Sequence, residues 1–322
     1  MFAMFAMFSL FSRLSSLRSS FRSSFRFSSV PSRPMVRLRV LALTSLVASA
    51  FSFADTHADD RPFPAGVDVT IPCDTLTLAG TLYSDDATQR TGIVILTGSG
   101  EWDRRHPIRR KMIRCLIESG LVVLDFDKRG IGGSGGVYTD GPDLHERASD
   151  AAAAIRFLRA QPEIDRVGVW GISQGGWVGQ IVAAEDPSLA FAILVSAPGV
   201  SPVLQSLYQR MERLRQEGWR DDEVADAYVV RGVLRRYYQT GEGRRELERA
   251  WAEAKGEGWF AKLGWRDAPP SRDSLNAEQR AFFTRHGAYE PAPDLARSTV
   301  PTLCLFGGKD RHIPVEESVR ET

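Results

Sequence analysis

The segment from Val167 to Trp177 constrains the fold of this chain more than any other stretch. A short apolar run ends at Gly171, and apolar residues at helical spacing begin just after Ser173. Gly171 and Gly175 stand two residues before and two residues after the serine. A serine on a tight turn from a strand into a helix has a strained backbone, so its flanking residues must lack Cβ atoms. The segment therefore predicts a strand, a sharp turn at Ser173 and a helix.

A serine on such a turn is typical of a catalytic nucleophile. The turn raises the hydroxyl above the sheet, and the following helix directs its free N–H groups at a developing oxyanion. The alternative interpretation is an ordinary Gly/Ser turn that starts a helix. The context favours the nucleophile, because a strand-like run precedes Ser173 and a helix-like stretch follows it.

Apolar runs that alternate with helical patterns predict a sheet covered by helices. Continuous apolar runs, typical of strands buried on both faces of a parallel sheet, cover residues 92–96, 121–126, 167–171, 191–196 and 300–306. Helical stripes lie between them at about 107–119 and 148–158, and an alternating pair at 67–71 and 76–82 comes first. This order predicts an α/β fold with a doubly wound, mostly parallel sheet.

Residues 202–298 form a block without a convincing strand, in which apolar residues recur at helical spacing. We expect a helical insertion here, and two interpretations of it stay open. Its amphipathic helices either pack on themselves or form a lid over Ser173 with aromatic side chains facing the pocket. The aromatic residues in question are Tyr208, Trp219, Tyr228, Tyr237, Trp251 and Trp259.

The insertion divides the chain into four expected parts. These are a leader at 1–58, a first core segment at 59–201, the helical lid at 202–298 and a second core segment at 299–322. Residues 1–54 hold seven arginines and no acidic residue or lysine, which leaves 34 basic against 40 acidic side chains in the remainder. The body is therefore mildly acidic and carries no nucleic-acid footprint.

The leader has the pattern of a signal peptide. A short basic segment at 35–39 precedes an apolar run from Val40 to about Phe53, and small-residue cleavage patterns follow at 48–50 and 52–54. The run is short for a membrane span, so we expect export with a signal peptide at about 35–54, no membrane span after its removal, and a true start at Met35. Import into an organelle is the alternative, because the leader is also rich in Arg and Ser.

Four motifs in order resemble those of the α/β-hydrolase superfamily, in particular its lidded esterase, thioesterase and serine-aminopeptidase-like members. They are the loop at 96–100, the Asp-x-Arg-Gly-x-Gly-x-Ser turn at 127–134, the turn at Ser173 and the strand and loop at 300–314. The resemblance covers about residues 65–200 and 287–322. It implies a serine hydrolase that cleaves an ester, thioester or small peptide bond.

The roles that go with this chemistry fall on four residues. Ser173 is the expected nucleophile, and the backbone N–H groups of Gln174 and Ser99 are the expected oxyanion hole. Asp310 is the candidate for the acid that orients the base, with a loop-capping aspartate as the alternative interpretation. The sequence shows no cofactor-binding motif, and its three cysteines have no metal-ligand spacing.

The general base is the missing member of the expected triad. The family's histidine follows one further strand, several tens of residues after the acid, whereas twelve residues follow Asp310. None of the histidines is a good substitute; these are His57, His106, His145, His286 and His312.

We therefore expect a C-terminally truncated hydrolase with little activity. It lacks the last strand and helix, has its base beyond residue 322, and leaves an uncovered edge at the 300–306 strand. The alternative, from another functional class, is a non-catalytic binding protein that keeps the pocket without the base.

Overall fold

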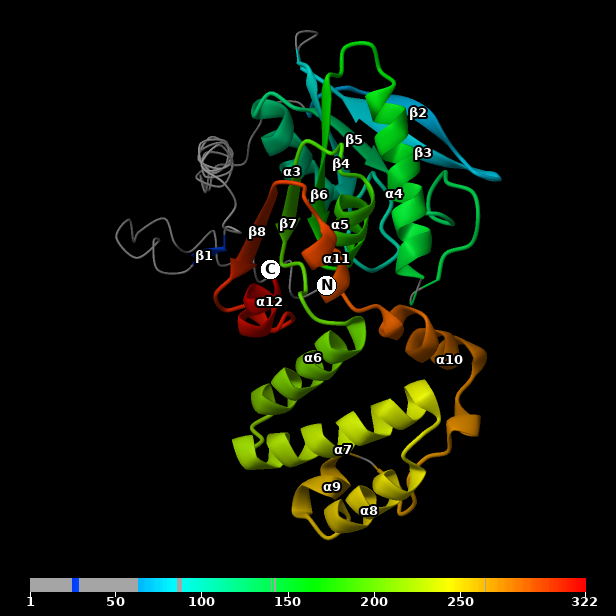
Figure 1. The fold of residues 1–322 in the computed structure, drawn as a ribbon, viewed down its shortest axis with the longest axis vertical. Helices are drawn as coiled ribbons and strands as arrows, with labels where there is room; N and C mark the ends of the chain where they lie inside the picture. The colour runs from blue at the N-terminus through cyan, green and yellow to red at the C-terminus, as the bar shows by residue number, and fades with distance from the viewer. Residues whose placement is uncertain (1–24, 29–62, 86–88, 140, 142, 264) are drawn as a thin grey trace.

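The computed structural model describes residues 25–28, 63–85, 89–139, 141, 143–263 and 265–322 (Figure 1). Their strands form one sheet with the order β1-β8-β7-β6-β4-β5-β3-β2. The bounds are β1 (Phe25–Ser28), β2 (Gly66–Cys73), β3 (Leu76–Tyr83), β4 (Thr91–Leu96), β5 (Val122–Phe126), β6 (Arg166–Ile172), β7 (Ala192–Val195) and β8 (Thr302–Gly307).

The centre of the sheet is parallel and its two ends are antiparallel. β4 pairs in parallel with β5 and β6, and the parallel pairing continues through β7 to β8. β2 and β3 pair antiparallel and join the sheet through β5. The strand order turns back at β4, so the crossover from β4 to β5 lies on one face of the sheet, and the crossovers from β5 to β6 and from β6 to β7 lie on the other. The predicted doubly wound, mostly parallel α/β fold is confirmed.

Each buried strand contributes side chains to two separate hydrophobic cores, because its side chains alternate between the two faces of the sheet. Ile93 and Ile95 of β4 pack with α3 (Pro107–Glu118), whereas Val94 and Leu96 pack with α4 (Leu144–Arg159) and α5 (Gln174–Glu185). This double burial explains why the central strands read as continuous apolar runs.

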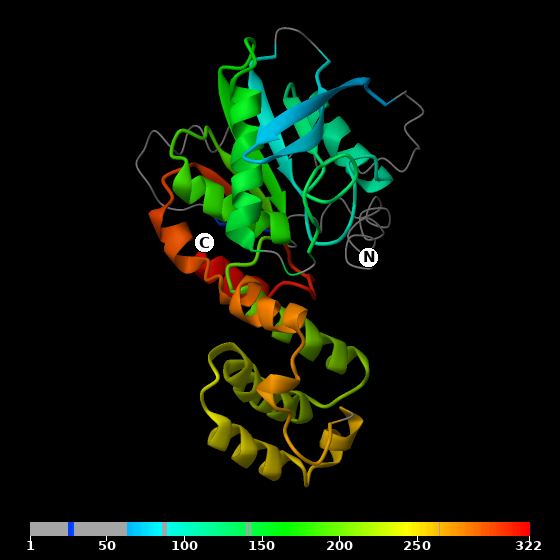
Figure 2. The same cartoon turned by 90° about the vertical axis from the view of Figure 1, so that its right-hand side faces the viewer.

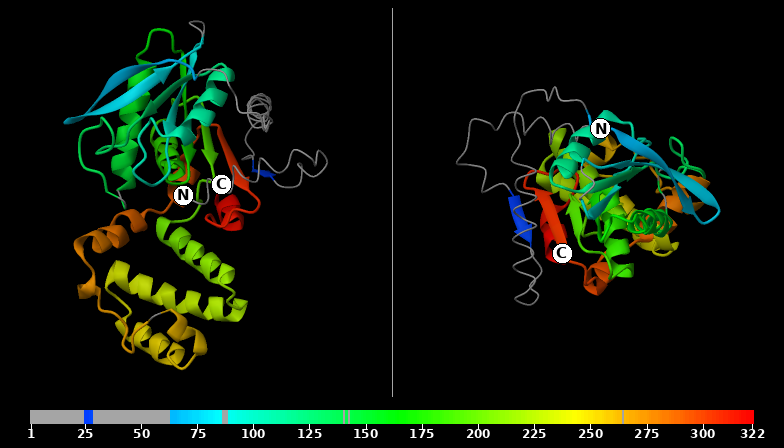
Figure 3. Two further views of the ribbon diagram at one scale, coloured as in Figure 1. Left: turned by 180° about the vertical axis from the view of Figure 1, so that it is seen from behind. Right: turned by 90° about the horizontal axis from the view of Figure 1, so that it is seen from above.

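The predicted helical block is a lobe that projects from one end of the sheet (Figure 2). Its helices are α6 (Pro202–Gln216), α7 (Asp221–Thr240), α8 (Arg244–Ala254), α9 (Gly258–Lys262), α10 (Ala277–Thr284) and α11 (Ala292–Arg297), with short 3-10 turns at Arg272–Ser274 and His286–Ala288. The chain enters the lobe through α6 and returns through α10 and α11 (Figure 3).

The lobe has a hydrophobic core of its own. Trp251 and Trp259 are buried in it, and Trp219 and Tyr237 pack against it. Tyr228 is exposed. These four packed aromatics therefore follow the interpretation in which the helices pack on themselves.

The far edge of the sheet differs from the prediction. β1 pairs antiparallel with β8, so the expectation that the 300–306 strand is an uncovered edge is wrong, as is the exclusion of the whole leader from the fold. The backbone N–H and C=O groups of an edge strand accept any extended segment, and composition did not single out 25–28. The expected signal peptide at 35–54 lies outside the described residues and stays a prediction. Within the described ranges, no helix has the length and apolarity to cross a bilayer.

The thiols give a direct test of this packing. Cys73 and Cys304 are buried, and burial raises the pKa of each to about 11. Since the thiolate is the reactive form, we expect neither to react with Ellman's reagent at pH 8 in the native protein. Cys115 is half-buried, so at most one equivalent should react before unfolding and three in guanidinium. Two or more fast equivalents in the native protein would contradict the fold.

Candidate active site

Ser173 lies where β6 ends and α5 begins, with φ 53° and ψ −119°. A left-handed φ on a residue with a Cβ costs about 1–3 kcal/mol and persists only where the surroundings enforce it. Two backbone hydrogen bonds do so. The N–H of Ser173 donates to the carbonyl of Val195 (3.1 Å), and the N–H of Gly176 donates to the carbonyl of Ser173 (2.8 Å). The predicted sharp turn is confirmed.

The glycines at this turn are required by backbone-to-backbone contacts. A Cβ on Gly171 would overlap the carbonyl oxygen of Gly175, and one on Gly175 would overlap the carbonyl oxygen of Leu96 in β4. Gly176 is equally constrained, because its Cβ would overlap that of Ala197. The start of α5 is therefore pressed against the ends of three strands, and the serine has one position available to it.

The loop after β4 passes directly beside the serine. A Cβ on Gly98 would lie 3.4 Å from the Cβ of Ser173, and Ser99 follows as an exposed residue. The Lys128 ammonium, almost fully buried, donates to the carbonyl of Gly98 (2.9 Å) and to that of Gly100. In a trans peptide the N–H points opposite to the C=O, so Lys128 fixes the direction of the Ser99 N–H.

Sequence reasoning missed this role of Lys128. Its only signal was a lysine at the variable position of the Asp-x-Arg-Gly turn, and nothing in the spacing linked that turn to the 96–100 loop.

Asp127 holds its own turn together and ties it to a neighbouring loop. It is fully buried and accepts the N–H of Gly133 (3.1 Å) and the N–H of Arg104 (2.6 Å), and it also pairs with the Arg104 guanidinium. Arg129 pairs locally with Asp150 and Glu146. Asp127 therefore ties the turn after β5 to the loop that carries Ser99.

Asp310 follows β8 at the same edge of the sheet as Ser173. Its Oδ1 accepts the N–H groups of His312 (2.8 Å) and Ile313 (3.2 Å), so it does cap its loop. β7 separates β8 from β6 in the sheet. Strands in a sheet lie about 4.8 Å apart, so Ser173 and Asp310 follow strands about 10 Å apart.

The lobe contacts the loop of Asp310. The amide nitrogen of Gln205 in α6 donates to the carbonyl of His312 (2.8 Å). Tyr208, one turn along α6, lies near Asp310, Glu212 and Glu317; burial and these carboxylates raise the pKa of its phenol. Of the aromatics weighed from the sequence, Tyr208 is the one placed at the sheet edge.

The histidines in the described part of the chain do not complete the triad. None of their rings hydrogen-bonds to Ser173 or Asp310. The ring of His106 stacks on Trp102, and that of His286 packs edge-on against Trp177. The Nδ1 of His145 lies 3.8 Å from the Oε1 of Glu185, and His312 is exposed. His57 lies outside the described residues. Within those residues there is also no group of three or more His, Cys, Asp or Glu side chains able to bind a metal ion.

A protein family, a single related sequence and several solved structures resemble this chain. The sequence profile of the family described as X-Pro dipeptidyl-peptidase (S15 family) matches residues 53–319. The polyketide transferase grgF of Penicillium sp. is 30% identical over 125 residues, which are 38% of this chain and 42% of that protein.

Two solved structures also resemble this chain. DcsB, in complex with its substrate analogue, is 18% identical with a TM-score of 0.50 over 80% of this chain and 86% of its own, which shows a shared fold. The esterase Pf2001 of Pyrococcus furiosus is 24% identical with a TM-score of 0.39 over 50% of this chain and 62% of that chain. The match thus spans less than two thirds of both the transferase and this esterase.

Replacing Gly175 with alanine tests the packing of the turn. Because its Cβ would overlap backbone, which cannot move aside like a side-chain tip, we expect Gly175→Ala to lose more than about 3 kcal/mol of unfolding free energy. Gly232→Ala is the matched control. Gly232 lies inside α7 with open space around it, so alanine should add about 0.5–1 kcal/mol there. Urea unfolding measures both, and equal effects at the two positions would contradict the packing described.

Proposed function

We propose, from the premise that this chain belongs to the X-Pro dipeptidyl-peptidase (S15) family, that it is a serine hydrolase with Ser173 as nucleophile. The membership and the fold together make it an α/β hydrolase. The observation that carries the proposal is the left-handed backbone of Ser173, beside the loop of Gly98. A folded chain retains such strain where a side chain must be presented for chemistry.

The mechanism that fits these residues passes through an acyl-enzyme. The Oγ of Ser173 attacks the carbonyl carbon of the substrate as a base removes its proton. The N–H groups of Gln174 and Ser99 then stabilise the negative oxygen, and each such donor is worth a few kcal/mol. The leaving group departs with the proton, and water releases the acyl group from Ser173 by the same steps in reverse order.

The base in this proposal is a histidine oriented by Asp310, and none of the histidines in the described part of the chain takes this place. Asp310 retains one carboxylate oxygen, Oδ2, that takes no part in the cap of its loop. A carboxylate of this kind holds an imidazole in the tautomer that accepts the serine proton.

The proposed substrate is a small molecule with an ester, thioester or peptide bond, bound between the sheet edge and the lobe. Gln205 ties α6 to the loop of Asp310, and Tyr208 lies beside it. The lobe then acts as a lid, and α6 contributes one wall of the acyl or leaving-group pocket.

Fluorophosphonate labelling tests the nucleophile, because the probe forms a covalent bond only with an activated serine. We expect the full natural protein to be labelled and its Ser173→Ala variant to remain unlabelled at equal thermal stability. Ser201→Ala is the control, since Ser201 is also buried near the sheet edge but lies on ordinary extended backbone. Equal labelling of the wild type and Ser173→Ala would place the reactive nucleophile elsewhere, and no labelling of either protein would favour the binding-protein alternative.

Lys128→Met tests the orientation of the oxyanion loop. The substitution keeps the apolar stem but removes the ammonium that holds the carbonyls of Gly98 and Gly100. Removing one oxyanion donor typically costs 10²–10³ in kcat, so misaiming the Ser99 N–H should lower kcat on a p-nitrophenyl ester by about 10- to 100-fold. The KM should change little.

The matched control for this variant is Lys255→Met, which removes a surface ion pair with Asp267 of small energetic value. Equal kcat values for Lys128→Met and the wild type would contradict the role of Lys128 in orienting the Ser99 N–H. A change confined to KM would do the same.

A further inference from the structure

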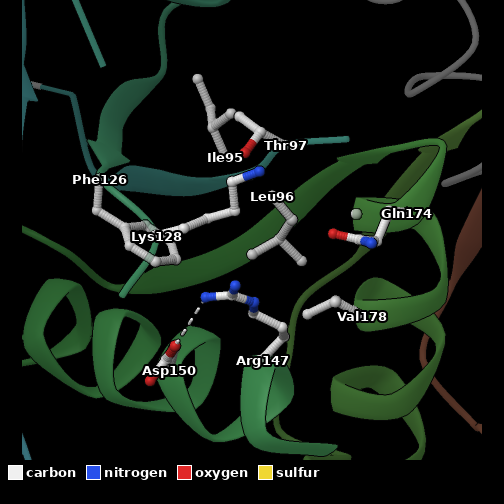
Figure 4. Close-up of a pocket in the computed structure, with 10 residues that line it drawn as sticks. Ile95, Leu96, Thr97, Phe126, Lys128, Arg147, Asp150, Gln174 and Val178 are labelled. Atoms are coloured by element: carbon white, nitrogen blue, oxygen red, sulfur yellow. Dashed lines mark ion pairs between the residues drawn. The ribbon is translucent and has the colours of Figure 1, made fainter. Parts of the chain in front are cut away.

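A small cavity lies behind the nucleophile turn, between the first turn of α5, the end of β4 and the helix α4 (Figure 4). Gln174, Gly175 and Val178 of α5 line one side, and Leu96 and Thr97 line another. The cavity has a volume of about 20 Å³. A single water needs about 10–15 Å³ measured in this way, so the space suits one water-sized species.

The guanidinium of Arg147 rises from α4 into the middle of these residues (Figure 4). Arg147 is 5% exposed, and its Nε, Nη1 and Nη2 have no hydrogen-bond partner among the described residues. A guanidinium carries five N–H donors, and leaving them unsatisfied in a buried place is costly. Burial accordingly lowers the pKa of Arg147.

Asp150 gives Arg147 only a long ion pair and no hydrogen bond. Its Oδ2 lies 3.9 Å from the Nη1 of Arg147, beyond hydrogen-bond distance. Both of its carboxylate oxygens are instead bonded by Arg129, at 2.5 and 2.9 Å. The one carboxylate at the cavity is therefore already paired with another arginine.

The charges around the cavity leave an excess of one cation. Lys128, Arg129 and Arg147 are the positive side chains, and Asp150 and Glu146 are the negative ones. The first turn of α5 adds the positive end of a twelve-residue helix and contains no acidic side chain. One negative charge in the cavity would balance the cluster and supply acceptors for Arg147.

We infer that this cavity binds a chloride-sized monoanion between Arg147 and the first turn of α5. A cavity of this volume suits one chloride-sized ion better than phosphate or the carboxylate of a substrate. Because α5 also carries Ser173, the ion would join α4 to the base of the nucleophile turn. Gln174 and Lys128 border both this cavity and the proposed oxyanion site, but the inference does not depend on the reaction proposed for Ser173.

Bromide replaces chloride in such sites and can be located by its anomalous scattering. In crystals of the full chain soaked in sodium bromide, we expect an anomalous peak in the cavity, in contact with the guanidinium of Arg147. Density there without anomalous signal would identify a water molecule and overturn the inference. So would bromide peaks confined to the protein surface.

Thermal melting in solution provides a second readout. At equal ionic strength, sodium chloride should raise the Tm above its value in sodium gluconate, by about 2–4 °C when chloride is at about ten times its Kd. Arg147→Met should abolish this difference. Arg156→Met is the matched control, because Arg156 lies on the exposed face of the same helix, and it should keep the full difference.

An equal chloride response in Arg147→Met and the wild type would overturn the site, as would no response in the wild type. If Arg147→Met does not fold, the bromide experiment on the wild type decides the question alone.

Discussion

The geometry of this molecule depends on the contact of backbone with backbone at the start of α5. Gly175 rests against the carbonyl of Leu96, and Gly171 rests against the carbonyl of Gly175, with no side chain between them. Two strands and a helix are thereby fixed to one another at van der Waals distance. The strained backbone of Ser173 is a consequence, because no relaxed conformation joins β6 to α5 across so short a gap.

A second layer of charged side chains holds the loops around this turn. Lys128 donates hydrogen bonds to two carbonyls of the loop after β4. Its neighbour Asp127 accepts the N–H of Arg104, which lies later in the same loop. Both residues are buried. In a low-dielectric setting such charge-assisted hydrogen bonds are stronger than in water, so the loop keeps its direction without packing of its own. The turn after β5 thus acts as a support for the loop after β4, the proposed oxyanion loop.

The sequence predicted the parts of this arrangement that are local. The central strands show as continuous apolar runs because both faces are buried. The turn at Ser173 shows because the serine and its glycines stand within a few residues of one another, although Gly175 itself contacts Leu96. Long-range partners have no such signature. Nothing in the spacing of Lys128 or Arg147 indicates which carbonyls or which cavity they reach, since each meets elements far away in the sequence.

The same limit applies to the lobe and to the sheet edge. Helical spacing identifies the apolar face of a helix but not the surface that this face covers. The burial of Trp251 in the lobe's own core therefore could not be predicted from the sequence. Tyr208 occupies a similar position in the pattern and lies instead beside Asp310. The pairing of β1 with β8 uses backbone groups that every extended segment carries, and composition gives no information on it.

The central claim is that the turn at Ser173 and the loop at Ser99 form one oxyanion site. A crystal structure of the full natural protein carrying a covalent phosphonate tests this most directly. The account predicts a bond from Ser173 Oγ to phosphorus, with one phosphoryl oxygen about 2.7–3.1 Å from the backbone nitrogens of both Gln174 and Ser99. A phosphonate attached elsewhere, or one whose oxygen points away from both nitrogens, would contradict it.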